Sequence, residues 1–472
     1  MSGMRCLLAG ALFGAMLAAC TEKADTGLPR HGYTHAEGPF DFEVALGAAE
    51  NQTQTRAADF DDLSIANISE VWVGLFDTED HHIIGFGSVE NRNSTALTQN
   101  VSIENLFFDD GHPDAHVAAV VNYAGVEARL GDGEKKPLLD VLKYDVGSLE
   151  DFCNVAVDVV SAENAVNAGR GNHVVMSGFF TTSTANFVVT PTLDEDGTLK
   201  SFATPANIGK ITMLIYTEST AFEYQISFSN NLGYNQNSNY IYLRPMFSHL
   251  EVNVNLNAGA IDRNGGVEWK LCNVPRYVYL IEHATIEDCT PYTAETWAAV
   301  TPAASDLYDD GYYTMTGFTS DTTKEADAPY DIIGEPVTGG NGTYSFGFWH
   351  YENKHWGLAS ATNYAQREAT FAGTDIFSSL CPSVDRTFNN NATYMVIRTT
   401  GTDGSNYDFR VHEGFATNST NSSDTASARD FSTFRNVDYA YTITINGVGS
   451  ALSPMSTRGA GSDIEVEVEA AR

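Results

Sequence analysis

The chain has 472 residues, 26 basic and 61 acidic side chains, and a formal net charge of -35 at pH 7. So large an acidic excess excludes nucleic acid and an anionic membrane surface as expected partners, because both would repel the chain. The length suits two or three domains, and 26 Phe and 22 Tyr side chains favour a strand-rich protein.

The first twenty residues have the pattern of an exported protein. Arg5 supplies a positive charge, residues 7–16 are mostly apolar, and residues 17–20 read Leu-Ala-Ala-Cys. This apolar stretch is too short to span a bilayer, so residues 1–19 are predicted to be a signal peptide. The sequence at 17–20 resembles the lipobox of bacterial lipoproteins, which implies lipidation of Cys20 and an outer-membrane anchor through that lipid.

Four cysteines remain after the signal peptide and Cys20, at positions 153, 272, 289 and 381. Their wide, irregular spacing matches no zinc pattern and no small disulfide scaffold. One or two disulfides, or four buried thiols, both fit an exported protein, and the sequence leaves the pairing open.

Alternation of apolar and polar residues predicts many short strands. The first has four apolar residues on one face, namely Phe40, Phe42, Val44 and Leu46, which alternate with Asp41, Glu43 and Ala45. Apolar runs at residues 68–76 and 116–122 predict more buried strands, and further strands are expected at residues 83–86, 252–256, 439–446 and 464–469. Helical periodicity is confined to residues 137–142 and 362–371.

A polar stretch rich in Asn and Ser at residues 230–239 predicts a domain boundary near residue 240. Short strands separated by turn residues, without repeating strand–helix units, predict an all-β sandwich architecture.

Three stretches in the second half of the chain contain a recurring type of motif. Residues 348–353 read Phe-Trp-His-Tyr-Glu-Asn, residues 392–397 begin with Ala-Thr-Tyr, and Arg435-Asn436 precedes Tyr439 and a strand that ends at Gly447. Together with residues 116–122, 176–178 and 243–247, they resemble the signatures of the fimbrillins, the Mfa-like subunits of type V pili. The signatures occur along this chain in the same order as in the family. The similarity runs from about residue 40 to residue 450.

The resemblance implies two transthyretin-like β-sandwich domains and an assembly route. The precursor is exported as a lipoprotein, an arginine-specific protease cuts it, and its first strand is replaced by a strand from the C-terminal region of another pilus subunit. The expected segments are a signal peptide (1–19), a propeptide with the first strand (20–56), an N-terminal domain (57–240), and a C-terminal domain with a tail strand (241–472).

Residue by residue, the resemblance places the cut between Arg56 and Ala57. The displaced strand then contains Phe40, Phe42, Val44 and Leu46, and the donor strand contains Ile464, Val466 and Val468. Arg30 and Arg458 are rival cleavage positions, and pairing of the tail strand within its own sheet is the alternative to donation.

No pattern of catalytic residues is present: the sequence has no Gly-x-Ser-x-Gly, no His-Glu-x-x-His and no phosphate-binding glycine loop. A non-enzymatic protein without cofactor or metal is therefore expected. His350 and His355 have the wrong spacing for a zinc helix, His81 and His82 fit a solvated turn, and Asp109-Asp110-Gly111 fits a turn before it fits a calcium site.

The sequence leaves three functions open, all at the cell surface. The first is a polymerising fimbrial subunit that serves adhesion. The second is a membrane-retained glycan-binding lipoprotein or tip adhesin, in which Trp349, Tyr351 and Trp356 would stack on sugars; packing of these aromatic residues in a core is the simpler interpretation. The third is a basal anchor subunit that keeps its lipid and its first strand.

Overall fold

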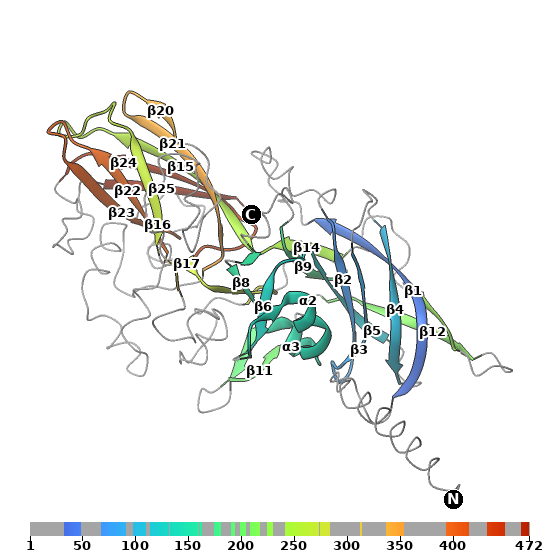
Figure 1. The fold of residues 1–472 in the computed structure, drawn as a ribbon. Helices are drawn as coiled ribbons and strands as arrows, with labels where there is room; N and C mark the ends of the chain where they lie inside the picture. Colours follow the sequence, from blue (N-terminus) through green and yellow to red (C-terminus); the bar gives the residue numbers. More distant parts are fainter. Residues whose placement is uncertain are drawn as a thin grey trace, which may run out of the picture.

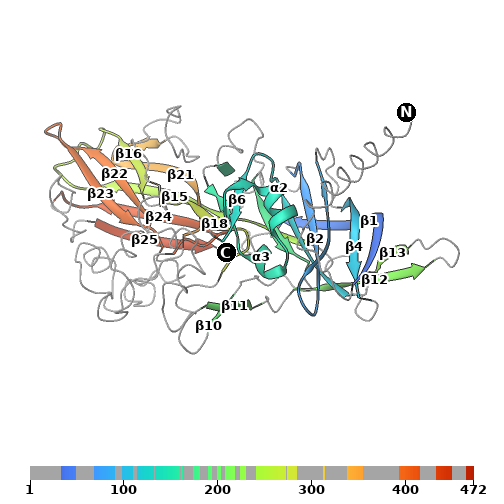
Figure 2. The same cartoon turned by 60° about the horizontal axis from the view of Figure 1, so that its bottom comes forward.

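The structure of the chain, a computed structural model, has two strand-rich halves arranged end to end (Figure 1, Figure 2). It describes residues 33–48, 68–90, 98–109, 114–131, 133–159, 161–162, 174–180, 190–193, 199–203, 208–217, 224–229, 241–272, 274–283, 312–313, 337–353, 393–414, 432–448 and 464–471. Over these residues the protein is all-β, as predicted, with only short helical turns.

The N-terminal half is built around a ring of strands. Neighbouring strands follow the order β5-β2-β3-β4-β1-β14-β9, and β9 pairs with β5 to close the ring, while β12 and β13 extend the sheet beyond β5. The bounds are β1 Thr34–Ala48, β2 Val71–Asp77, β3 Ile83–Val89, β4 Thr98–Phe108, β5 Asp114–Val121, β9 Met176–Phe179, β12 Lys210–Thr217, β13 Tyr224–Ser229 and β14 Ile241–Pro245.

Strand β2 is apolar on both faces because it has a core on each side. Val73 and Leu75 lie in the core enclosed by the ring. Trp72 and Phe76 point to the other side, where their ring centroids lie 5.7 and 5.8 Å from that of Phe152. A strand buried on both faces is expected to have a continuous apolar run, and β2 has one.

A small layer of strands and helical turns covers this outer face of the ring. Its elements are β6 Glu127–Leu130, β7 Lys136–Pro137, α2 Leu138–Asp140, the π-helical turn η3 Val141–Asp145, α3 Leu149–Cys153, β8 Val155–Asp158 and β18 Tyr277–Tyr279. The helix predicted at 137–142 is confirmed in α2 and η3, and the one predicted at 362–371 lies outside the described residues. A separate hairpin is formed by β10 Thr190–Leu193 and β11 Leu199–Ala203.

The C-terminal half is a sandwich of two sheets. One has the order β20-β21-β15-β24-β25 and the other β16-β22-β23. Trp269 on β16 stacks on Phe346 and Phe348 on β21, with centroids 5.1 and 4.8 Å apart, so aromatic rings fill the space between the sheets. The bounds are β15 Phe247–Leu256, β16 Val267–Cys272, β17 Val274–Pro275, β19 Tyr312–Tyr313, β20 Thr338–Gly340, β21 Thr343–Tyr351, β22 Tyr394–Thr400, β23 Asn406–His412, β24 Asp438–Ile445 and β25 Ile464–Ala471.

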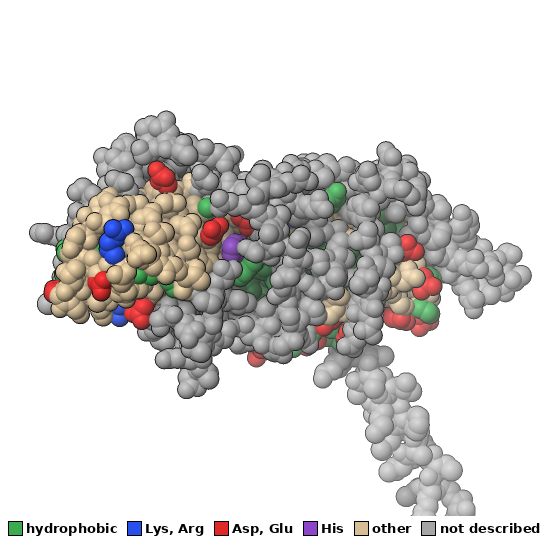
Figure 3. All heavy atoms as spheres, turned by 90° about the horizontal axis from the view of Figure 1, so that it is seen from above, with side chains coloured by type: hydrophobic (Ala, Val, Ile, Leu, Met, Phe, Trp, Pro, Cys, Tyr) green, Lys and Arg blue, Asp and Glu red, His purple; other side chains and the backbone are tan. Residues whose placement is uncertain are grey.

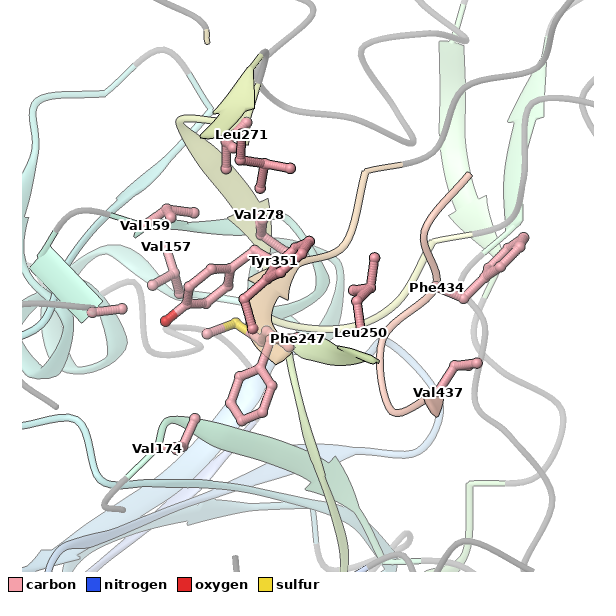
Figure 4. Close-up of a cluster of buried hydrophobic side chains, with 14 of the residues drawn as sticks. Val157, Val159, Val174, Phe247, Leu250, Leu271, Val278, Tyr351, Phe434 and Val437 are labelled. Carbon is pink, nitrogen blue, oxygen red and sulfur yellow. The ribbon is translucent and has the colours of Figure 1, made fainter. Parts of the chain in front are cut away.

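The two halves share one continuous core. The chain crosses between them at Met246, since β14 pairs in the N-terminal ring and β15 in the C-terminal sandwich. Figure 4 shows Val157 and Val174 of the N-terminal half in one buried cluster with Phe247 and Tyr351 of the C-terminal half. The junction is thus packed rather than a simple linker.

Candidate functional site

Strand β1 is an interior strand of the N-terminal ring. It pairs antiparallel with β4, from Thr34 opposite Phe108 to Ala45 opposite Thr98. Its last residues pair in parallel with β14, where Leu46 lies opposite Ile241. Residues 34–45 of β1 thus pair with β4 and residues 46–48 pair with β14, so β1 links these two strands and the ring closes through it.

The predicted apolar face of β1 points into the core of the ring. Phe40 is 7% exposed, Phe42 4%, Val44 3% and Leu46 0%, and all four belong to the ring core. Asp41 and Glu43 point to the outside and are exposed. The alternation predicted from the sequence is therefore confirmed, while the displacement of this strand stays a prediction.

Polar contacts hold the beginning of β1 in place. The hydroxyl of Tyr33 donates a hydrogen bond of 2.6 Å to Oδ2 of Asp80 in the turn between β2 and β3. Partial burial and this carboxylate raise the pKa of Tyr33, so the hydroxyl stays a donor. His35 stacks on Phe107, with ring centroids 4.7 Å apart.

The tail strand β25 lies at the edge of the C-terminal five-stranded sheet (Figure 2). It pairs antiparallel with β24, from Ile464 opposite Ile445 to Ala471 opposite Asp438. Val466 and Val468 are 9% and 5% exposed, and Glu467 points outward. In this structure the tail therefore covers the edge of its own sheet, which is the alternative that the sequence left open.

The fimbrillin-like motifs of the C-terminal half meet in a buried polar network. Arg435 forms an ion pair with Glu352, and the two side chains are 1% and 6% exposed. The same guanidinium donates hydrogen bonds to the carbonyl oxygens of Leu280 (2.9 Å) and Tyr279 (2.5 Å). Ser177, from the motif at 176–178, also donates to the carbonyl oxygen of Leu280.

A second part of this network surrounds His350. Its Nε2 lies 2.5 Å from Oε2 of Glu413, and both side chains are fully buried. Thr433 donates a hydrogen bond of 2.9 Å to the same carboxylate, and Asn353 donates one of 2.8 Å to Thr393. No sequence pattern around Glu413 marks it as the partner of a histidine some sixty positions earlier.

Two glycines of the ring permit close backbone approach. A Cβ atom on Gly178 would lie 1.7 Å from the carbonyl oxygen of Tyr242, where β9 pairs with β14. A Cβ atom on Gly38 would lie 2.2 Å from the carbonyl oxygen of Ile103, beside the irregularity in the β1–β4 pairing. Only glycine fits between these backbones without displacing them.

Several residues singled out in the sequence lie outside the described residues. They are Cys20, Arg30, Arg56, Ala57, Cys289, His355, Trp356, Cys381 and Arg458. Cys153 and Cys272 are buried free thiols. Among the described residues no group of His, Cys, Asp or Glu is arranged to hold a metal ion, and no helix has the length and apolarity needed to cross a membrane.

The two described aromatic candidates for sugar binding pack in or against the core and do not project from the surface. Tyr351 is 2% exposed and belongs to the continuous core. Trp349 packs partly buried against that core, with its ring edge-on to Phe247 and 4.5 Å from the ring of His249. Core packing therefore accounts for both.

No protein-family model and no curated protein matches the chain. Among solved structures, it aligns with the tip fimbrial protein Mfa3 of Porphyromonas gingivalis at 13% identity and a TM-score of 0.40, over 93% of this chain and 99% of that one. It aligns with the fimbrilin FimA of the same organism at 11% identity and a TM-score of 0.42, over 91% and 96%. The fimbrial anchor protein Mfa2 aligns at 10% identity and a TM-score of 0.28, over 91% and 97%.

This chain and each of these three proteins align over nearly their whole lengths.

Proposed function

We propose that this protein is a non-catalytic fimbrial subunit of the cell surface that polymerises by exchange of strands. A cut between Arg56 and Ala57 by an arginine-specific protease frees β1, and the site left between β4 and β14, here called the β1 groove, takes the tail strand of another subunit. Export as an outer-membrane lipoprotein through Cys20 precedes the cut. The observation that carries this proposal is the position of β1, which links β4 to β14 and so closes the ring.

Loss of β1 would expose part of the ring core and leave backbone hydrogen-bonding groups of the ring without partners. Four buried apolar side chains leave the core with β1, and at about 1.5–3 kcal/mol each they correspond to roughly 6–12 kcal/mol of burial. The edges of β4 and β14 would also present unpaired backbone groups. Such a gap favours the binding of an extended segment that has one apolar face.

The tail strand has the pattern that the β1 groove requires. Residues 40–44 read Phe-Asp-Phe-Glu-Val and residues 464–468 read Ile-Glu-Val-Glu-Val, so apolar and acidic positions coincide. The residues of β4 directly opposite Asp41 and Glu43 are the neutral Ser102 and Asn100, so acidic side chains at these two positions face no like charge directly across the pair. A shift by one residue would place glutamates in the core, which restricts the register.

The segment that connects β24 to the tail strand is long enough to reach a neighbour. It spans residues 446–463. At full extension such a segment reaches about 60 Å. A tail that left β24 would therefore remain tethered while it entered another subunit.

Mass spectrometry of the surface form tests the cut. A mature N-terminus at Ala57 is the expected result, and a lipidated, uncut Cys20 would instead identify an anchor subunit or a membrane-retained adhesin. A start at residue 31 would move the cut to Arg30 and leave β1 attached, which contradicts the proposal.

Gel electrophoresis of the cut protein without boiling tests the exchange. Ladders of oligomers are expected from the native tail, and Val466→Asp with Val468→Asp should abolish them because charges would enter the core. Glu467→Gln is the matched control, since this side chain points outward. Ladders that persist in the double variant would refute donation by the tail.

A further inference from the structure

The β1 groove and the tail strand are connected by two strands of the C-terminal sheet. One wall of the groove is β14, which is separated from β15 by Met246 alone. Strand β15 pairs with β24, and the chain leaves β24 towards the tail. The most direct path for tension between the groove and the tail therefore crosses the β15–β24 pair.

Strands β15 and β24 run parallel, and this direction decides how they are loaded. Their register runs from His249 opposite Asp438 to Leu256 opposite Ile445. The groove is attached to the beginning of β15 and the tail to the end of β24, so tension pulls the two strands along their length in opposite directions. All hydrogen bonds of the ladder are then strained together, whereas strands pulled apart from a shared end separate one bond at a time.

Packing opposes sliding of these two strands. Every second residue of each strand is at most 1% exposed: Leu250, Val252, Val254 and Leu256 lie opposite Tyr439, Tyr441, Ile443 and Ile445. Because side chains alternate between faces, a slip by one residue would turn these apolar groups out of the core. The other edge of β15 is held by β21 over its length.

The beginning of the pair is held by additional bonds. The amide of Asn436 donates to the carbonyl oxygen of Phe247 (2.8 Å), and the amide of His249 donates to that of Val437 (3.2 Å). Next to them, Arg435 is bound to Glu352 and to the carbonyl oxygens of Leu280 and Tyr279. The buried guanidinium thus fixes the start of β24 to the junction of the two halves.

We propose that the parallel β15–β24 pair is the tension-bearing element of the subunit, which transmits force in shear between the strand it receives and the strand it donates. The mechanical role rests on the proposed strand exchange, because the exchange places the two points of attachment. The resistance to shear itself is a property of the single subunit and is measured without a fibre.

Single-molecule force spectroscopy on the full chain tests this inference. An azide-bearing residue at position 446 provides one attachment point, and the second is placed either at position 251 in β15 or at position 257 just after β15. The first pair of attachments loads the strands in shear, and the second opens them from their shared end, where Asn257 and Asn446 are hydrogen-bonded. The shear geometry should give a rupture force several times higher.

Equal forces in the two geometries would overturn the inference, whether or not the cut protein forms ladders. Ladders that fail to form would instead contradict the strand exchange. Val254→Ala with Ile443→Val, at two positions that lie opposite one another, should lower the force in shear and leave the opening force nearly unchanged. An unchanged shear force in a folded double variant would likewise contradict a role for the interlocked side chains.

Discussion

Ser177 and Arg435 donate hydrogen bonds to the same acceptor, the carbonyl oxygen of Leu280, from opposite halves of the molecule. The amide of Leu280 in turn donates to the carbonyl oxygen of Val155 (2.8 Å). Two sequence motifs that are far apart in the chain therefore converge on one peptide unit. Through these hydrogen bonds the two motifs connect the two halves of the molecule.

Replacement of Arg435 by Gln should strongly destabilise the protein. It would leave the carboxylate of Glu352 buried without its cation, and removing one partner of a buried ion pair costs about 3–5 kcal/mol. Urea denaturation measures the change in the free energy of unfolding. Arg398→Gln is the control: its ion pair with Asp408 is partly exposed, with side chains 29% and 25% accessible, so a loss of about 1 kcal/mol or less is expected. Similar losses in both variants would contradict the role of burial.

Truncation of Phe42 should destabilise the N-terminal ring. Phe42→Ala removes a side chain that is 4% exposed from the ring core, and such a truncation costs about 3–5 kcal/mol. Asp41→Ala, on the exposed face of the same strand, should change the free energy of unfolding by about 0.5 kcal/mol or less. Thermal denaturation of the uncut chain compares the two, and a small effect of Phe42→Ala would mean that β1 contributes little to the core.

Gly178→Ala should disturb the closure of the ring. The new Cβ atom would meet the carbonyl oxygen of Tyr242, so the backbones of β9 and β14 must separate, at a cost of about 1–3 kcal/mol. Hydrogen exchange should show faster exchange of amides in both strands. Gly259→Ala is the control, because nothing lies within 4 Å of a Cβ atom there. Unchanged protection in β9 and β14 would show that the strands absorb the methyl group.

His116 should make the protein less stable at mildly acidic pH. Burial lowers the pKa of His116, whose Nδ1 lies 3.0 Å from the carbonyl oxygen of Gly209. The unfolded chain takes up this proton near pH 6.5, while the folded chain takes it up only at lower pH. The contribution is therefore complete above about pH 6.5 and is lost as the pH falls towards the folded value. His116→Gln should reduce this slope in denaturation measured between about pH 7.5 and about pH 5, and an unchanged slope would assign it to other groups.

Much of the secondary structure was predictable because apolar residues alternate with polar ones along several strands. The strands predicted at 40–46, 83–86, 252–256 and 464–469 lie within β1, β3, β15 and β25. Those predicted at 68–76, 116–122 and 439–446 overlap β2, β5 and β24, which begin or end one to three residues away. In β1, β15 and β24 one buried face imposes the period of two, whereas β2 and β5 have the apolar runs of strands buried on both faces.

Pairing between strands was not predictable from the same pattern. The sequence does not indicate that β14 pairs in parallel with β1 or that β15 pairs in parallel with β24, because alternation states which face is buried and not which neighbour lies alongside. The same limit applies to the buried partners of the motif residues: Glu352 and Arg435 were both noted in motifs, yet only the fold brings them together.

The acidic surface fits the composition of the chain. Figure 3 shows Asp and Glu side chains at both ends of the visible face. Charges of one sign keep copies of the chain apart in solution. In the proposed fibre, neighbouring subunits would therefore need a contact strong enough to overcome this repulsion, and a whole strand with its buried side chains would be such a contact.

The closed ring also has a consequence for the newly made protein. As long as β1 sits between β4 and β14, neither strand offers an open edge to a stray partner, and open edges are what lead β-proteins to aggregate. In the proposed assembly, the precursor would thereby stay inert during its passage to the surface. Its reactivity would begin with cleavage of the bond between Arg56 and Ala57, so the moment of joining would be set by the protease and not by how many copies have accumulated.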